Sequence, residues 1–112
     1  MPPPWIQWPF MFPAVTSVHG VAIRLTDERW LHISEEHSEM AGYATDVLEV
    51  LEQPDVVFAG SAGELLAARA IEPGKYLVVV YREKTPDDGF VVTAFLTRRF
   101  RQLAKREQVW PR

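Results

Sequence analysis

The pattern of apolar and polar positions predicts two helices in the first half of the chain. A helix over 26–38 is indicated because Thr26 can cap its start and acidic residues fill its first turn. Gly42 is expected to break the helical pattern. A second helix over roughly 43–53 is predicted from apolar residues at i, i+3 and i+4 spacing, and it should end before Pro54.

The remaining apolar segments predict β structure. Loose alternation over 18–25 indicates a short strand ahead of the helices. Four strands are expected after the helices, at 55–59, 64–71, 76–83 and 90–97. Short turns between them favour an antiparallel meander, and the segment 98–107 is compatible with a last helix. The predicted fold class is α+β, with two N-terminal helices packed on a mainly antiparallel four-stranded sheet.

Residues 1–13 differ from the rest of the chain. Five of the nine prolines lie there, interleaved with four large aromatic residues, Trp5, Trp8, Phe10 and Phe12. Proline fixes φ and removes backbone donors, so we expect an extended arm that docks on the body or on a second subunit. A loosely packed tail is the alternative. The predicted organisation is an arm, 1–17, and one folded domain, 18–112, with a homodimer through the arm as one option.

Composition narrows the class of protein. A chain of 112 residues, 47% of them hydrophobic, suits a single domain. The absence of cysteine excludes a disulfide framework, a thiolate metal site and thiol catalysis. No apolar run approaches the roughly 18 residues that span a bilayer, and the start does not resemble a signal peptide. We therefore expect a cytoplasmic protein with no membrane partner.

Charge is unevenly distributed along the chain. The net charge of −3 argues against strong, unselective binding of nucleic acid. Nine acidic residues and one basic residue lie between positions 26 and 55, whereas six basic residues and one acidic residue lie between 98 and 112. A short basic segment is therefore present in an acidic chain.

The first predicted helix carries two of the three histidines. Arg29, His32 and Glu36 share its polar face. His32 and His37 are separated by about 140° around the axis, so one continuous helix cannot present both to a metal ion. Imidazole is the usual acid or base near neutral pH, and guanidinium binds phosphate. The alternative is a solvated helix face with one capping histidine.

The predicted strands offer a second cluster. If the turn before the third strand of the meander has two residues, Arg69 lies opposite Val78, and Arg82 shares that face. A four-residue loop before the last strand then adds Thr93 and Thr97 to the same face. The apolar side chains of the other face would pack on the helices, leaving this polar face open or covered only by the arm or the C-terminal segment. An edge position or a structural ion pair is the alternative for such arginines.

Several segments together resemble a known superfamily of nucleases. These are "LTDERWLHISEEHSEM", "VLEVLEQPDVVF", an arginine on a strand, "KYLVVVYRE" and "GFVVTAFLTRR". In order and spacing they resemble the phage and standalone branch of the BECR superfamily, which groups barnase, EndoU, the colicin tRNases and the RelE toxins. The resemblance covers about residues 18–112. It implies helices packed on a four-stranded antiparallel sheet and cleavage of RNA without a metal ion or cofactor.

The resemblance also implies a set of site residues. The helical "R-x-x-H-I-x-x-x-H" places Arg29, His32 and His37, and the strand motifs place the other residues. The catalytic residues expected in this way are His32, His37, Arg69 and Thr93. The substrate-binding residues expected are Arg29, Tyr81 and Arg82, and the basic C-terminal segment adds Arg98 and Arg99.

The expected function is that of a metal-independent endoribonuclease. The 2′-hydroxyl of RNA would attack the adjacent phosphate while a base and an acid transfer protons and cations stabilise the phosphorane. One form of this hypothesis makes the protein the toxin of a toxin–antitoxin pair, with RNA as substrate and an antitoxin as partner. The rival hypothesis is a non-catalytic interaction module on the same scaffold. Convergence of His32, His37, Arg69 and Thr93 in one cleft would favour the enzyme, and scatter would favour the module.

Overall fold

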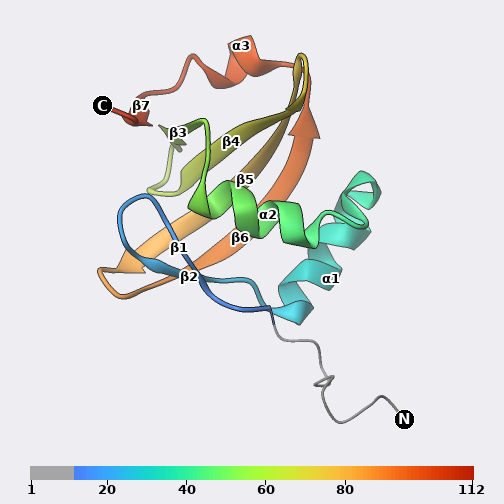
Figure 1. The fold of residues 1–112 in the computed structure, drawn as a ribbon, viewed down its shortest axis with the longest axis vertical. Coiled ribbons are helices and arrows are strands. Elements are labelled where there is room, and N and C mark those ends of the chain that lie inside the picture. Colours follow the sequence, from blue (N-terminus) through green and yellow to red (C-terminus); the bar gives the residue numbers. More distant parts are fainter. Residues whose placement is uncertain (1–11) are drawn as a thin grey trace, which may run out of the picture.

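The computed structural model describes residues 12–112 and shows a curled, seven-stranded mixed sheet (Figure 1). The elements in chain order are β1 Val15–Thr16, β2 Ala22–Arg24, α1 Asp27–Glu36, the 3₁₀ turn η1 Ser38–Met40, α2 Ala44–Glu52, β3 Val56–Ala59, β4 Leu65–Glu72, β5 Lys75–Thr85, β6 Asp88–Thr97, α3 Phe100–Leu103 and β7 Gln108–Trp110. The strand order is β1-β2-β6-β5-β4-β3-β7.

Both predicted helices are confirmed, with different roles. The Thr26 hydroxyl accepts a hydrogen bond from the Arg29 amide at 3.0 Å and caps α1. Only Ile33 of α1 is buried, so this helix lies at the rim of the fold. Helix α2 buries four residues, Val47, Leu48, Val50 and Leu51, and lies across one face of the sheet (Figure 1). We call this face the helix face and the opposite one the outer face.

The four predicted strands of the meander are present as β3 to β6, paired antiparallel in chain order. The predicted fold class is nevertheless wrong, because the sheet has seven strands and is mixed rather than four-stranded and antiparallel. Strand β2 joins β6 in parallel, with Ile23 opposite Gly89. Strand β2 falls within the short strand predicted over 18–25, whereas β1 and β7, with two and three residues, are too short to show a period of two in the sequence.

A register shift between β4 and β5 separates Arg69 from Arg82, so the predicted cluster of these two arginines is wrong. The two-residue turn between β4 and β5 forms, but the pairing shifts by one position after Ala70. Arg69 therefore lies opposite Leu77 rather than Val78, on the helix face. Arg82 stays on the outer face, so the two arginines do not share a surface.

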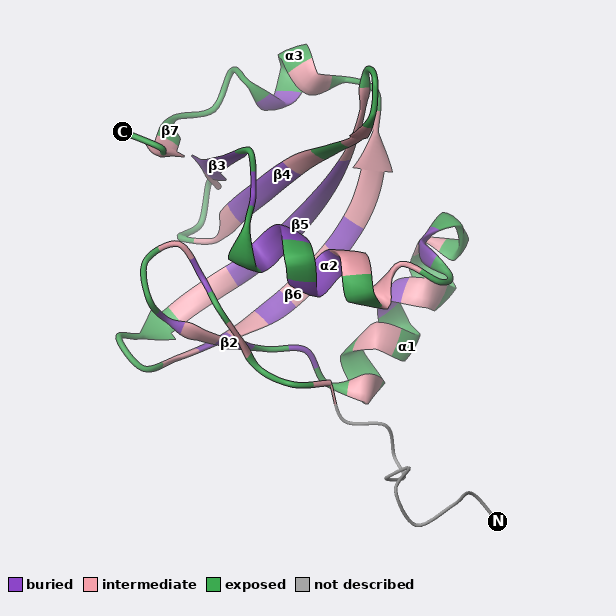
Figure 2. Ribbon diagram, viewed as in Figure 1, coloured by how far each residue is buried: buried purple, intermediate pink, exposed green. Residues whose placement is uncertain are grey.

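The apolar residues form two clusters, one on each face of the sheet. Figure 2 shows buried residues along α2 and the central strands. The larger cluster joins α2 to residues of the helix face that are fully buried, including Ile23, Val57, Leu77 and Val79. The smaller cluster covers part of the outer face under α3: Val56, Phe58, Leu66, Ala68, Val78 and Leu103. The strands at the centre of the sheet are apolar on both faces, as expected for a covered sheet.

Residues of the predicted N-terminal arm reach the body where they are described. Val15–Thr16 forms β1 and pairs with β2. The Phe12 ring packs edge-on against Trp30, with 6.4 Å between ring centroids. The predicted docking of Trp5, Trp8 and Phe10 concerns residues outside the described part of the chain.

The junction of β2 and β6 is built on a glycine and an ion pair. Arg24 donates two hydrogen bonds to the Asp88 carboxylate, at 2.8 and 3.0 Å. These bonds lower the pKa of Asp88 below its usual value. Gly89, next along the strand, is buried, and a Cβ atom there would lie 2.2 Å from the Arg82 carbonyl oxygen and 2.7 Å from Cδ1 of Ile23.

We predict that Gly89→Ala lowers the free energy of unfolding by about 3 kcal/mol or more, because backbone atoms must move to admit the methyl group. Chemical denaturation followed by circular dichroism measures this loss. The matched control is Gly42→Ala, at a positive φ of 86° with open space around it, where only backbone strain of about 1 kcal/mol is expected. Equal losses in the two variants would contradict the prediction.

Candidate active site

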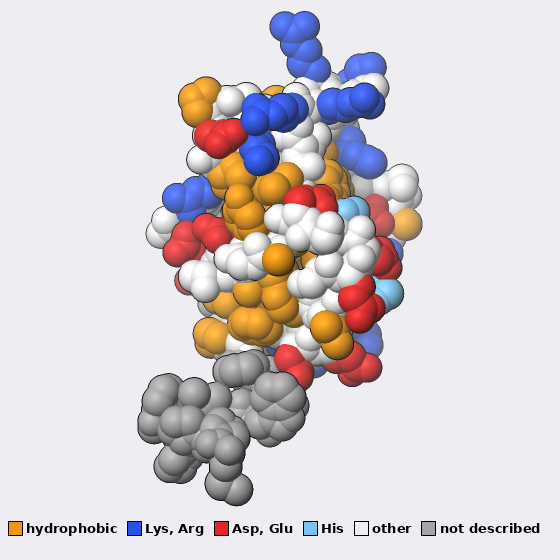
Figure 3. All heavy atoms as spheres, turned by 90° about the vertical axis from the view of Figure 1, so that its right-hand side faces the viewer, with side chains coloured by type: hydrophobic (Ala, Val, Ile, Leu, Met, Phe, Trp, Pro, Cys, Tyr) orange, Lys and Arg blue, Asp and Glu red, His pale blue; other side chains and the backbone are white. Residues whose placement is uncertain are grey.

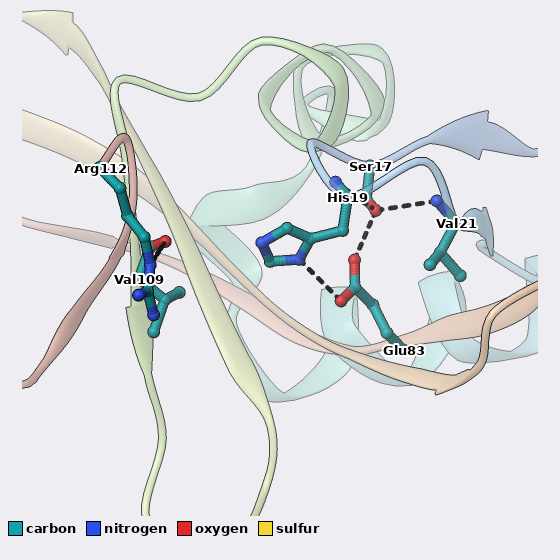
Figure 4. Close-up of polar contacts among 6 residues, drawn as sticks. All are labelled: Ser17, His19, Val21, Glu83, Val109 and Arg112. Atoms are coloured by element: carbon teal, nitrogen blue, oxygen red, sulfur yellow. Dashed lines mark hydrogen bonds and ion pairs between the residues drawn. The ribbon is translucent and has the colours of Figure 1, made fainter.

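Pockets lined by described residues include one of about 600 Å³ and three smaller ones of about 400, 340 and 220 Å³. The first of these, the His19 pocket, lies between the β1–β2 turn, the start of β4, the end of β5 and the C-terminal strand (Figure 4). Its lining residues are His19, Gly63, Leu65, Glu83, Val109, Trp110 and Arg112. The wall is mostly apolar, and the polar groups converge from distant parts of the sequence.

Glu83 is the centre of this arrangement. One carboxylate oxygen accepts a hydrogen bond from the Ser17 hydroxyl at 2.5 Å, and the other lies 2.8 Å from Nδ1 of His19 (Figure 4). Ser17 is only 5% exposed, and its hydroxyl oxygen accepts hydrogen bonds from the backbone N–H groups of His19 and Val21, each at 3.3 Å. Because those two N–H groups donate to the Ser17 oxygen, the hydroxyl hydrogen of Ser17 is the one that points to Glu83. Both oxygens of the carboxylate are thus engaged.

This contact orients the His19 ring. A carboxylate accepts, so Nδ1 carries the hydrogen and Nε2 of the neutral ring keeps its lone pair. In Figure 4 the second ring nitrogen points away from Glu83 toward the side of the pocket where Arg112 lies. The Ser17 hydroxyl donates to the carboxylate and not to the imidazole, so it is not an activated nucleophile. The geometry suits His19 for taking up or giving a proton.

Two arginines lie near this pocket. Arg112 lines it, and its Nε donates to the carbonyl of Val109 at 3.1 Å. Arg82 lies behind the Gly63 wall, where Nη1 is 3.3 Å from the position that a Cβ atom of Gly63 would occupy. The nearest carboxylate to Arg82 is that of Glu64, at 3.7 Å. The pocket lining therefore combines an oriented imidazole with one guanidinium, that of Arg112, whereas Arg82 stays outside the lining.

The three histidines all face a carboxylate, but only His19 does so across the fold. His32 pairs with Glu36 at 2.5 Å, one turn along α1, with both side chains 54% exposed. His37 lies 3.6 Å from Glu39, its near neighbour in sequence. Exposed pairs of this kind contribute little to stability or to orientation. Glu83, in contrast, is 17% exposed and fixed from a second side by Ser17.

The residues predicted from the helix do not join the pocket. Arg29 and His32 line a separate shallow depression at the start of α1, together with Thr26 and Glu28. His37 ends α1, and its ring centroid lies 6.3 Å from that of Phe95.

The residues predicted from the strands and the C-terminal segment are also dispersed. Arg69 lies beside Asp46 and Glu49 of α2, and Thr93 lies on the outer face opposite Val80. Arg98 pairs with Glu72 at 2.9 Å, and Arg99 lines a pocket near α3. None of the predicted site residues lines the His19 pocket, and Arg82 comes near it only through Gly63.

Tyr81 lies in the core rather than on a substrate-binding surface. It is fully buried on the helix face, two positions before Glu83. Its hydroxyl has no hydrogen-bond partner within residues 12–112. Burial raises the pKa of the Tyr81 hydroxyl, and the charge of Glu83 raises it further. The hydroxyl therefore stays protonated and contributes an unpaired polar group to the interior.

Sequence reasoning missed His19, Glu83, Ser17 and Arg112. The one local signal is the turn Ser17-Val-His-Gly20, in which a histidine precedes a glycine at a φ of 82°. Its partner Glu83 is 64 positions away, at the end of a strand that reads as an ordinary valine-rich segment.

The described residues show neither a metal-ligand cluster nor a membrane-spanning helix. Among them, no group of three or more His, Asp or Glu side chains is placed to hold a metal ion. No helix in residues 12–112 is long and apolar enough to cross a membrane. Comparison with known family models, with curated proteins and with solved structures finds no match for this chain.

We predict that Tyr81→Phe raises the free energy of unfolding by about 1 kcal/mol, because it removes a buried hydroxyl that no protein group in residues 12–112 pairs with. Denaturant titration measures the change. Tyr76→Phe, at a half-buried ring stacked on Phe100, is the control and should stay within about 0.5 kcal/mol of the parent. A loss of stability in Tyr81→Phe would show that the hydroxyl makes a favourable bond.

Proposed function

We propose that the protein is a metal-independent endoribonuclease in which His19, oriented by Glu83, transfers protons. The observation that carries this proposal is the fixed Ser17–Glu83–His19 arrangement in the pocket of about 600 Å³. The resemblance of residues 18–112 to BECR nucleases supplies the reaction class. The proposal moves the acid–base group from the helix histidines to the β1–β2 turn.

The chemistry follows from the groups in the pocket. Nε2 of His19 takes the proton of the 2′-hydroxyl as its oxygen attacks the adjacent phosphorus. The P–O5′ bond breaks, the proton passes from the imidazolium to the 5′-oxygen, and the product carries a 2′,3′-cyclic phosphate. Glu83 stabilises the imidazolium that forms between the two transfers, 2.8 Å from Nδ1. Arg112, which lines the pocket, would stabilise charge on the phosphorane.

A non-catalytic interaction module remains the second candidate. The observation that favours it is the dispersal of His32, His37, Arg69 and Thr93 over separate surfaces. Such a module would bind RNA or a partner protein without cleaving RNA. An assay of RNA cleavage separates the two candidates.

We predict cleavage of single-stranded RNA in EDTA, with 2′,3′-cyclic phosphate ends. His19→Ala should reduce the rate about 10²–10⁴-fold, because it removes the proton-transfer group. Glu83→Gln should reduce the rate as well, since the amide cannot stabilise the imidazolium. Gel electrophoresis of end-labelled RNA measures the rates.

The matched controls for this prediction are the other two histidines. His32→Ala and His37→Ala should cleave within about threefold of the parent, because their carboxylate contacts are local and exposed. Loss of activity in these variants with retention in His19→Ala would refute the assignment of His19. No cleavage of any RNA by the parent would favour the interaction module.

The toxin form of the proposal has its own test. Expression of the parent in a bacterial host should arrest growth, and His19→Ala, at equal protein level by immunoblot, should not. The reason is that arrest by a nuclease requires the proton transfer that His19 supplies. Equal arrest by both proteins would contradict a catalytic toxin.

A further inference from the structure

A second pocket, of about 340 Å³, lies on the outer face of the sheet beneath α3. Leu66 and Leu103, both nearly buried, and Phe95 supply its apolar lining. Its polar side chains share one property, that they can donate hydrogen bonds: Thr97, Arg99, Gln102 and Arg106. The pocket thus combines an apolar surface with a donor-rich rim.

This pocket differs from the other three in its charge. The His19 pocket contains Glu83, the depression at the start of α1 contains Glu28, and the one beside α2 contains Asp46 and Glu49. Among the described residues, no carboxylate lines the pocket beneath α3. Its charged lining is purely cationic, unlike that of the three pockets just compared, so it has the electrostatic character that an anionic group requires.

The two arginines of this pocket are free to bind an anion. Arg98, the neighbour of Arg99, is engaged by Glu72 at 2.9 Å. Arg99 and Arg106 form no ion pair with any carboxylate in residues 12–112. Figure 3 shows Lys and Arg side chains gathered over the end of the molecule that carries α3, with most acidic side chains of that view below them.

Aromatic rings accompany these cations. Tyr76 and Phe100 stack with their centroids 4.3 Å apart, and both pack against the same apolar cluster as Phe95. All three rings are only partly buried. Guanidinium groups beside partly exposed rings suit single-stranded nucleic acid, whose phosphates pair with cations and whose bases stack on rings.

We propose that this pocket binds a nucleotide of single-stranded RNA, with the phosphate on Arg99 and Arg106 and the base against Phe95. The choice of RNA as the strand rests on the proposed function, whereas the pocket itself is a site of binding and not of cleavage. It holds the substrate at a surface separate from the His19 pocket, on the opposite face of the sheet.

The test is a binding measurement that does not depend on cleavage. Fluorescence anisotropy of a labelled single-stranded RNA of about 12 nucleotides, within the usual range of site sizes, is recorded with the His19→Ala full chain at several salt concentrations. The double variant Arg99→Ala/Arg106→Ala in this background should weaken binding about tenfold or more. Its slope of log K against log salt should fall by about 0.7, because one phosphate contact on a single strand is lost and each contributes about 0.7.

The control removes the same charge from the same segment outside the pocket. Arg101→Ala/Lys105→Ala, both exposed, should bind within about threefold of the background and keep most of the slope. Equal losses in the two double variants would overturn the proposal in favour of a diffuse basic surface. Unchanged binding in Arg99→Ala/Arg106→Ala would overturn it as well.

Two further outcomes distinguish RNA binding from the binding of an acidic protein, and RNA binding from RNA cleavage. If the chain binds polyglutamate through Arg99 and Arg106 but does not bind RNA, the occupant is an acidic protein and the proposal is wrong. If RNA binds through the pocket but the parent does not cleave it, the binding proposal holds and the proposed nuclease activity fails.

Discussion

The parallel pairing of β2 with β6 is the constraint on which the candidate active site depends. Gly89 of β6 pairs with Ile23 of β2 on one side and with Glu83 of β5 on the other. The row of paired residues Ile23, Gly89 and Glu83 brings the β1–β2 turn, with Ser17 and His19, beside the end of β5. Because a side chain at Gly89 would collide with the Arg82 carbonyl, the close approach of these strands requires glycine. The geometry of the Glu83 contacts is thus fixed by backbone packing rather than by the polar residues themselves.

Sequence reasoning found the parts of the fold that carry long local patterns. The apolar spacing of α2 and the valine-rich strands β4 to β6 are of this kind, and the Thr26 cap marks the start of α1. Sequence reasoning failed where a pattern is short or where the paired residues are far apart in the chain. Strand Ala22–Arg24 falls within the strand predicted over 18–25, but its parallel partner lies more than 60 positions away and no local pattern indicates that pairing. The bulge after Ala70 leaves no mark in the sequence, yet it moves Arg69 to the other face.

The candidate site likewise has one part that local sequence patterns predict and one part that they miss. Helix spacing places Arg29 and His32 together, and the structure keeps them together, but in a depression with only Glu28 and Thr26 among the described residues. His19 stands in a turn, where no periodic pattern applies, and its partners Ser17 and Glu83 are separated by 66 positions. Neither spacing nor composition can join such residues before the sheet order is known. The sequence supplies three histidines as candidates. The structure distinguishes His19, because its carboxylate partner is the most buried of the three.

The distribution of charge explains why binding and chemistry would lie at separate places. A net charge of −3 gives the whole molecule no long-range attraction for RNA, so affinity must come from a local patch. The His19 pocket is a poor patch, because the Glu83 carboxylate that orients the imidazole also repels a phosphate. The pocket beneath α3 has no carboxylate and two unpaired arginines among the described residues. Removing Glu83 to improve binding would release His19, so the two requirements can be met together only on different surfaces.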